Sequence, residues 1–274
     1  MNSLILGTRG SDLALAQTRI VAEKLRTAHP RLAIETKIIK TTGDQRLDVS
    51  LSAPGTLDKG LFTKELEEAL LAGEIDAAVH SLKDLPTEQP PGLILGAILE
   101  RADPSDVLVA KVAGGWKALP QGATVATSSP RRKAQLLHLR PDLHVVEIRG
   151  NVPTRLRKLA EDPTMDGLLL AKAGLDRLGH QIIPAGLHWA VVSEMLPAPG
   201  QGAIAIECRA NDPATRTVLQ PIHHEETARC VNAERDLLRS LGGGCSLPLG
   251  VLAWMENGKL HLRTFPKNLR DLTH

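Results

Sequence analysis

Two arginines at the start of a predicted helix have types and spacing that could do chemistry. A short β-like run ends at Ser128 and Ser129, and the proline that follows opens an apolar-periodic helix, since serine caps and proline starts a helix well. Arg131 and Arg132 occupy the first turn, against the positive end of the helix dipole, which costs up to about 1 kcal/mol when uncompensated. Free N–H groups, hydroxyls and guanidinium groups at one spot predict an anion-binding site.

The same arrangement recurs twice along the chain. The expected strand 143–148 runs into Arg149, and a new helix carries Arg155 in its first turn. Near the start of the chain, Arg9 follows a short strand and precedes the helix that Ser11 caps. Helix N-termini normally favour acidic residues, so the repeated arginines indicate a ligand with several carboxylates or phosphates. The alternative is a set of solvated arginines on loops.

A carboxylate and a thiol could supply reactive groups. Lys83 and Asp84 follow the expected strand 76–79, so they fall at a strand's carboxyl end; a turn with surface charges is the alternative. Cys245 follows three glycines, and such a backbone can approach a ligand closely. It is either an incidental thiol in a turn or a tether or nucleophile, the latter only if its loop faces the ligand.

The composition limits the class of protein. At 274 residues the chain should form two or three domains, with 42% hydrophobic residues for their cores. A net charge of +2 and an aromatic content of 2% argue against a nucleic-acid partner. No apolar run approaches the length of a membrane span, and the first residues lack the layout of a signal peptide.

Cysteine and histidine patterns indicate neither a metal site nor a disulfide framework. The three cysteines have no metal-ligand spacing and form no even set, which favours a reducing, cytoplasmic setting. Cys208 and Cys230 fall in strand and helix patterns, so we expect them to be small core residues. The run His-His-Glu-Glu at 223–226 consists of adjacent residues that do not share a helical face, so no metal is expected.

Strand and helix signals place these residues in two α/β lobes. The strand 4–6, a helix from Ser11 to about Ala28 and the strand 33–40 predict a parallel sheet with right-handed crossovers. Further strands are expected at 76–79, 93–99 and 203–207 in the first lobe and at 107–110, 124–127, 143–148 and 167–171 in the second. Ligand groups at strand ends in two lobes predict a hinged cleft between them.

The expected domains are lobe 1 (1–100 and 200–219), lobe 2 (104–195) and a small third domain (221–274). Proline- and glycine-rich segments mark the crossings between them. The third domain should begin with a helix over about 227–241 and end in two β runs. The step Asn257-Gly258 between these runs is typical of a β-hairpin.

Several motifs of the sequence carry a family resemblance. They are Thr8-Arg9, Lys59-Gly60-Leu61-Phe62, His80-Ser81-Leu82-Lys83-Asp84, Thr127-Ser128-Ser129-Pro130-Arg131-Arg132, Arg149-Gly150-Asn151, Arg155, Ala173-Gly174-Leu175, Gly200-Gln201-Gly202 and Gly243-Gly244-Cys245. With them, residues 1 to about 263 closely resemble the porphobilinogen deaminase (hydroxymethylbilane synthase) family. The resemblance implies an α/β fold of two periplasmic-binding-protein-like lobes with a cleft between them, plus a small α+β C-terminal domain.

The resemblance also implies an activity. Members of the family are transferases that condense four porphobilinogen units, with loss of ammonia, into the linear tetrapyrrole hydroxymethylbilane. The units are added to a dipyrromethane cofactor, which the resemblance attaches through a thioether to Cys245. It further implies a cytoplasmic enzyme, and nothing in the sequence demands a partner chain, so we expect a monomer that binds a small substrate and neither nucleic acid nor membrane.

Residue roles follow from the resemblance. Asp84 is expected to be the acid/base carboxylate, because loss of ammonia creates a cationic azafulvene that a buried carboxylate can stabilise. The acetate and propionate arms are assigned to Arg9, Lys83, Ser129, Arg131, Arg132, Arg149, Arg155 and Arg177. Phe62 should pack on a pyrrole ring. The remaining substrate- or cofactor-binding residues are expected to be Lys59, Ser81, Ser128, Gly150 and Gln201.

Two parts of the sequence depart from the family pattern. Pro54-Gly55 stands where many members carry a lysine, so loop contacts there should be weaker. After Arg263 the pattern is not continued, and a third domain of only about 50 residues should have a marginal core. A non-catalytic, two-lobed anion-binding protein is the competing interpretation; it explains the arginines but neither Asp84 nor the cysteine on its glycine loop.

Overall fold

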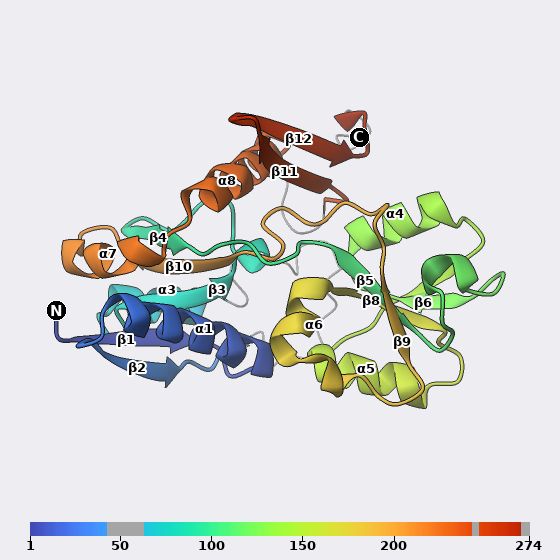
Figure 1. Cartoon of the computed structure of the whole chain (residues 1–274), viewed down its shortest axis with the longest axis horizontal. Helices are drawn as coiled ribbons and strands as arrows, with labels where there is room; N and C mark the ends of the chain where they lie inside the picture. The colour runs from blue at the N-terminus through green and yellow to red at the C-terminus, as the bar shows by residue number, and fades with distance from the viewer. Residues whose placement is uncertain (43–62, 243–246, 270–274) are drawn as a thin grey trace. The chain divides into compact units, whose positions relative to one another are not determined.

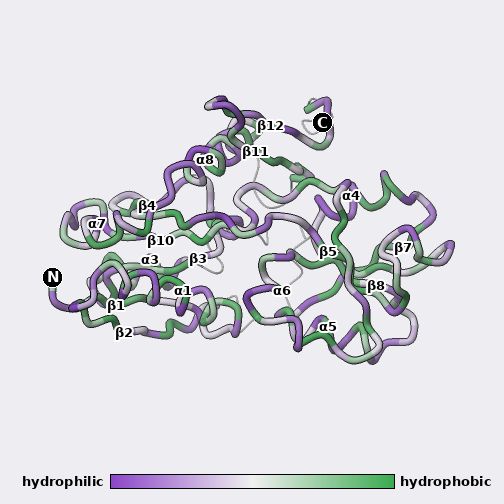
Figure 2. Tube along the Cα trace, viewed as in Figure 1, coloured by the Kyte–Doolittle hydropathy of each residue, from purple (hydrophilic) through white to green (hydrophobic). Residues whose placement is uncertain are grey.

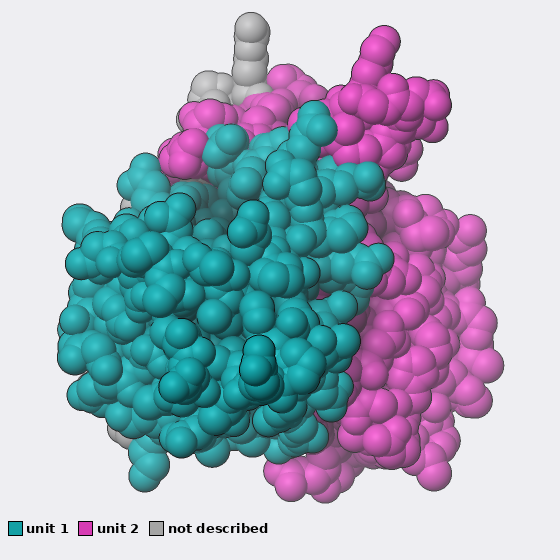
Figure 3. Space-filling model, turned by 60° about the vertical axis from the view of Figure 1, so that its left-hand side comes forward, with its two compact units in different colours: residues 1–102, 203–236 teal, residues 103–202, 237–274 magenta. Residues whose placement is uncertain are grey.

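The computed structural model describes residues 1–42, 63–242 and 247–269. The chain divides into two compact units, coloured separately in Figure 3. Unit 1 comprises Met1–Ala102 and Ala203–Asp236, and unit 2 comprises Asp103–Gly202 and Leu237–His274. Each unit is built around a five-stranded sheet with helices on both faces, so the predicted α/β class is confirmed.

The sheet of unit 1 has the strand order β2-β1-β3-β10-β4. Its strands are β1 (Ser3–Thr8), β2 (Ala33–Ile38), β3 (Ala77–Ser81), β4 (Leu93–Ile98) and β10 (Ile204–Arg209). β1 runs parallel to β2 and β3, as predicted. The sheet as a whole is mixed, because β10 is inserted antiparallel between β3 and β4. A strand contributed by a distant segment of the chain can enter a sheet in either direction.

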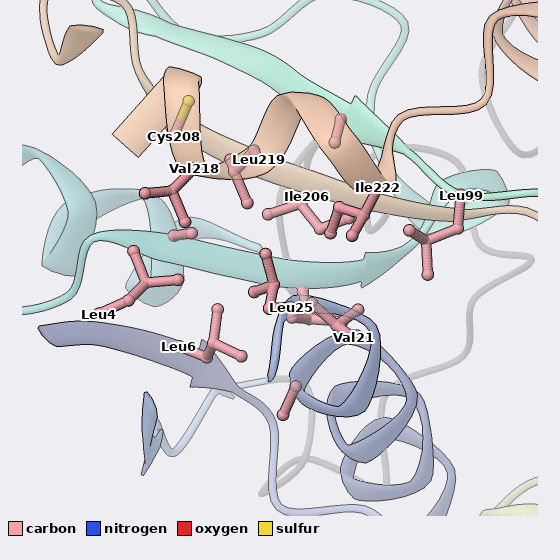
Figure 4. Close-up of a cluster of buried hydrophobic side chains, with 14 of the residues drawn as sticks. Leu4, Leu6, Val21, Leu25, Leu99, Ile206, Cys208, Val218, Leu219 and Ile222 are labelled. Carbon is pink, nitrogen blue, oxygen red and sulfur yellow. The ribbon is translucent and has the colours of Figure 1, made fainter. Parts of the chain in front are cut away.

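Helices cover both faces of this sheet (Figure 1). They are α1 (Asp12–Ala28), α3 (Lys64–Leu71), the 3-10 turn η1 (Leu82–Asp84), α7 (Pro213–Leu219), η4 (Gln220–Ile222) and most of α8 (Glu225–Ser240). α1 and α7 pack on one face, where Val21, Leu25 and Leu219 meet Leu6 and Ile206 (Figure 4). α3 and α8 cover the other face. Burial on both sides explains the nearly continuous apolar runs of inner strands such as β1 and β10, whereas most of the edge strand β2 is exposed.

The sheet of unit 2 has the order β7-β6-β8-β5-β9. Its strands are β5 (Asp106–Ala110), β6 (Thr124–Ala126), β7 (His144–Val146), β8 (Gly167–Ala171) and β9 (His188–Val191). β6 is parallel to β7 and β8, whereas β5 is antiparallel to β8 and β9. Figure 2 shows the hydrophobic character of β5 and β8. The edge strand β9 was not predicted, since its short, largely exposed run has no apolar periodicity.

The other elements of unit 2 are η2 (Gly115–Ala118), α4 (Pro130–Leu139), α5 (Val152–Glu161), α6 (Lys172–Leu178) and η3 (His180–Ile182), with the hairpin β11 (Gly250–Glu256) and β12 (Lys259–Phe265). The predicted hairpin is confirmed: Asn257 and Gly258 have φ values of 52° and 74° and join the paired residues Glu256 and Lys259. Both residues thus adopt the left-handed conformation that a two-residue hairpin turn requires. None of the helices in the described ranges is long and apolar enough to span a membrane.

Candidate functional site

A pocket of about 70 Å³ lies in unit 1 where β1 and β3 end. Its lining includes Arg9, Ser11, Gln17, Thr63, His80, Ser81 and Asp84. β1 and β3 are parallel neighbours, so their carboxyl ends fall at the same edge of the sheet. The structure therefore brings together three residues that the sequence singled out, Arg9, Ser81 and Asp84.

Helix α1 fixes one wall of this pocket. Ser11 caps the helix and accepts a hydrogen bond from the backbone N–H of Ala14 (3.3 Å), as its position in the sequence predicted. One turn further on, the amide of Gln17 donates to Oγ of Ser81 (2.8 Å) and is 3% exposed. Gln17 was not identified from the sequence, where a glutamine inside an amphipathic helix carries no distinguishing signal.

Asp84 is exposed, which corrects the expectation of a buried carboxylate. It ends the single turn η1, in which Leu82 takes the buried position. A three-residue turn can direct only part of its side chains into the core, so the apolar leucine is buried and the carboxylate faces the pocket. Lys83, between them, is half-buried.

In unit 2, Arg131 and Arg132 converge on Asp106, a fully buried carboxylate at the start of β5. Nη1 of Arg131 donates to Oδ2 at 2.5 Å, and Nη2 of Arg132 donates to Oδ1 at 2.8 Å. Burial alone would raise the pKa of Asp106, but the two guanidinium groups hold this pKa well below its usual range. The two arginines at the start of α4 are thus paired with a carboxylate of the protein itself.

Gln201 completes this cluster. Its amide donates to Oδ1 of Asp106 (2.9 Å) and to the carbonyl of Pro104 (2.7 Å). Gln201 and the two arginines were predicted to bind ligand, and those roles stay predictions; in the structure all three contact Asp106. Asp106 was not identified from the sequence, because an acidic residue directly after Asp103-Pro104-Ser105 is typical of a loop.

Arg149 lies in a different environment. Its Nη2 is buried and has no hydrogen-bond partner within the described ranges. The preceding loop is held by Ser128, whose Oγ donates to the carbonyl of Ile148 (2.6 Å) and accepts from its N–H (3.1 Å). A buried guanidinium nitrogen that lacks an acceptor is a place where a ligand carboxylate would be stabilised.

The loop between β7 and α5 is fixed by Gly150 and Arg155. Nε of Arg155 donates to the carbonyl of Gly150 (2.6 Å), which ties the first turn of α5 to the loop before it. Gly150 has a φ of 111°, where residues with side chains are strained. Asn151 caps α5 by accepting from the N–H of Thr154 (2.9 Å), and Ser129 caps α4, so both predicted helix starts are confirmed.

Arg177 lies in the last turn of α6, further from the end of β8 than the sequence suggested. Its Nη2 donates to the carbonyl of Gly202 (2.6 Å). Burial lowers the pKa of Arg177 to about 10, although Asp176 opposes the effect. No carboxylate of the described residues accepts a hydrogen bond from Arg177, so this half-buried cation could also serve an anionic ligand.

The predicted residues Lys59, Phe62 and Cys245 lie outside the described residues. Cys208 and Cys230 are buried in β10 and α8, which confirms them as small core residues. Burial raises the pKa of the Cys208 thiol to about 11, so this sulfur is a poor nucleophile. Among the residues that the structure describes, no group of three potential metal ligands is present.

These features define an α/β protein of two sheet units with cationic side chains at strand and helix ends, a class suited to a ligand with several carboxylates. Two family models match the chain: "Porphobilinogen deaminase, dipyromethane cofactor binding domain" over residues 4–217 and "Porphobilinogen deaminase, C-terminal domain" over residues 228–266. The chain belongs to the porphobilinogen deaminase family, whose members polymerise porphobilinogen into hydroxymethylbilane. The predicted family, activity and dipyrromethane cofactor are confirmed at this level.

Individual relatives agree. The chain is 51% identical over 268 residues to a porphobilinogen deaminase of Syntrophomonas wolfei subsp. wolfei, covering 96% of this chain and 84% of the relative. It is 50% identical over 266 residues to one of Chloroherpeton thalassium, with coverages of 96% and 82%. Solved structures are more distant: the BenM effector-binding domain with benzoate has 17% identity and a TM-score of 0.47, covering 88% of this chain and 93% of that one.

Proposed function

We propose that the pocket at the ends of β1 and β3 is where Asp84 acts on porphobilinogen. The observation that carries this proposal is the shared pocket of Asp84, Arg9 and Ser81. The C–N bond of the substrate's aminomethyl arm breaks, its electron pair leaves with the nitrogen as ammonia, and the methylene carbon that stays on the ring becomes cationic. A carboxylate beside that carbon and the ring N–H stabilises the developing positive charge. Arg9 lines the same pocket and provides a cation that pairs with a carboxylate arm of the substrate.

The second part of the proposal concerns the cofactor. Bound dipyrromethane supplies the primer to which new units are added, and its acetate and propionate arms are anionic. The described residues fit such a group, because Arg149 has a buried Nη2 without a partner and Arg177 is half-buried without a hydrogen-bonded carboxylate. These two residues, with Arg155, Ser128 and Ser129, hold the arms. Arg131, Arg132 and Gln201 remain in the proposal as residues next to these arms. Arg131 has a buried Nε without a hydrogen-bond partner among the described residues, whereas other donors of the two arginines bind the carbonyls of Leu196 and Leu169.

We further propose Cys245, which follows three glycines in the sequence, as the attachment point. Buried Cys208 and Cys230 leave it as the cysteine suited to alkylation. The expected effect of Cys245→Ser is loss of the mass of two pyrrole units from the intact protein and loss of the Ehrlich aldehyde colour. Cys230→Ala is the matched control and should keep both. A Cys245→Ser protein that retains the added mass would contradict this attachment.

Asp84→Asn tests the role of the pocket. Loss of the carboxylate should lower kcat by roughly 10²-fold or more, the range of acid–base contributions, with the cofactor mass and the circular dichroism spectrum unchanged. The control is Glu88→Gln, an exposed carboxylate four residues further on, for which kcat should stay within twofold. Substantial turnover by Asp84→Asn would refute the assignment.

The organisation and setting of the enzyme complete the proposal. A cofactor-attachment domain over 221–274 is supported by the C-terminal family model at 228–266 and by the separate two-stranded sheet of β11 and β12. A monomer in the cytoplasm that binds no nucleic acid is supported by the balanced net charge of +2 and the scarcity of cysteine. Light scattering of the purified chain tests the monomer, and a dimer mass would contradict it.

A further inference from the structure

A histidine–glutamate pair lies in the wall of the Asp84 pocket. His80 belongs to β3 and lines the pocket, and Glu207 belongs to the antiparallel neighbour β10. Nε2 of His80 and Oε2 of Glu207 are 3.2 Å apart, and the side chains are 4% and 0% exposed. The contact is not a regular hydrogen bond, so the attraction between the two groups is mainly electrostatic.

Glu207 is a buried carboxylate with few groups that could stabilise its negative charge. Within the described residues, neither of its oxygens accepts a hydrogen bond. Leaving an acidic group in such a place disfavours folding, and an apolar side chain of similar volume would serve the sheet better. A buried acid that contributes so little to packing, next to a pocket, is typical of a residue kept for chemistry.

Other charged groups surround the pair. Glu67 approaches from α3; burial raises the pKa of Glu67, and the nearby charge of Glu207 raises it further. On the pocket side, Arg9 follows β1 and Asp84 ends η1, whereas α1 contributes the neutral amide of Gln17. His80 is therefore the residue that lies between the carboxylates of Glu67 and Glu207 and the pocket.

We propose that His80 is a second acid/base group of the reaction and that Glu207 orients it. The charge of Glu207 favours a proton on Nε2, which leaves Nδ1 as the ring nitrogen that can accept a proton from the pocket. A carboxylate behind an imidazole plays the same part in Ser-His-Asp triads. The inference deepens the proposed function, because it rests on the reaction taking place in the Asp84 pocket.

The step needs a proton acceptor. The C–N bond of the substrate breaks with its electron pair, ammonia leaves, and the cationic carbon bonds to the free α-carbon of the terminal pyrrole. The C–H bond at that α-carbon then breaks, its electrons return to the ring, and its proton passes to Nδ1 of His80. His80 hands this proton to the departing ammonia, so that substrate ammonium and pyrrole give the extended chain and an ammonium ion. Asp84 stays ionised to stabilise the cation.

Chemical rescue tests the proposal on the holoenzyme. His80→Ala should lower kcat about 10²-fold without changing cofactor mass, and added imidazole should restore a part of kcat that rises with its concentration. The control is His261→Gln, a histidine 3.7 Å from Glu256 in the β11–β12 hairpin, which should keep wild-type kcat and ignore imidazole. Full activity of His80→Ala, or a loss that imidazole does not relieve, overturns the proposal.

The tautomer of His80 gives a readout that is independent of turnover. The ¹⁵N spectrum of wild-type holoenzyme near neutral pH should show protonated Nε2 and unprotonated Nδ1, and Glu207→Gln should mix the two tautomers. A proton fixed on Nδ1 in the wild type overturns the proposal even if His80→Ala does not fold. If Asp84→Asn is inactive while His80→Ala is fully active, only this inference fails; if Asp84→Asn turns over normally, the function proposed for the pocket fails.

Discussion

Replacing Asp106 by asparagine removes the carboxylate that accepts hydrogen bonds from both Arg131 and Arg132 in unit 2. Asparagine has the same shape, so packing against the surrounding strands is preserved and the change is one of charge. In the wild type, Asp106 is fully buried and Arg131 and Arg132 are 4% and 6% exposed. The variant therefore leaves two guanidinium groups in the interior with no counter-ion at that point.

The magnitude follows from this burial. Removing one partner of a buried ion pair costs about 3–5 kcal/mol, which is a large share of the roughly 5–15 kcal/mol that holds a protein folded. Urea unfolding followed by tryptophan fluorescence measures the loss directly. The chain's three tryptophans, Trp116, Trp189 and Trp254, all belong to unit 2, so the signal reports on the unit that carries Asp106.

A matched control makes the same loss of one negative charge at an exposed ion pair, so that the effect of burial can be measured. Glu161→Gln removes an exposed carboxylate that lies 4.0 Å from Arg157 on α5, with side chains 69% and 67% exposed. The expected change in the free energy of unfolding is below about 0.5 kcal/mol. An Asp106→Asn variant that is destabilised no more than Glu161→Gln would refute the reasoning that the two arginines depend on Asp106.

The remaining predictions concern pH, an ion pair and a glycine. Because the pKa of Asp106 is depressed in the folded chain, its contribution to stability is present above the usual carboxyl pKa of about 4 and is lost as the pH falls below it; acid titration of wild type and Asp106→Asn should show a steeper loss in the wild type. Glu234→Gln breaks the buried pair with Arg101 (2.7 and 3.0 Å) and should lower the urea-unfolding free energy by about 3–5 kcal/mol. Gly150→Ala should lower Tm more than Gly186→Ala, since only the former brings Cβ within 2.8 Å of a neighbouring side chain, and equal shifts would contradict this.

The helix starts and the hairpin turn could be predicted from the sequence because their signals are local. Ser11, Ser129 and Asn151 each cap the helix that their position predicted, and the Asn257-Gly258 step forms the predicted hairpin turn. Such signals act within a few residues along the chain, so no knowledge of the fold is needed to interpret them. The family motifs added the activity and the cofactor.

The direction of β10 in its sheet and the partners of the buried ion pairs could not be predicted from the sequence. The antiparallel insertion of β10 depends on where a segment more than a hundred residues away re-enters the sheet. The partner of Arg131 and Arg132 depends on β5 bringing Asp106 beneath the first turn of α4, and the partner of His80 depends on β10. These contacts join residues far apart in the chain, and only packing of the sheets determines them.

The sequence by itself thus determined which residues could bind a polycarboxylate and where the helices that carry them begin. The tertiary structure decided which of their charges already have partners: Asp106 takes donors of Arg131 and Arg132, whereas a buried nitrogen of Arg149 lacks an acceptor among the described residues. The physical reason is that a residue's type fixes its charge, but only the fold sets the distance to the opposite charge and the exclusion of water from the pair.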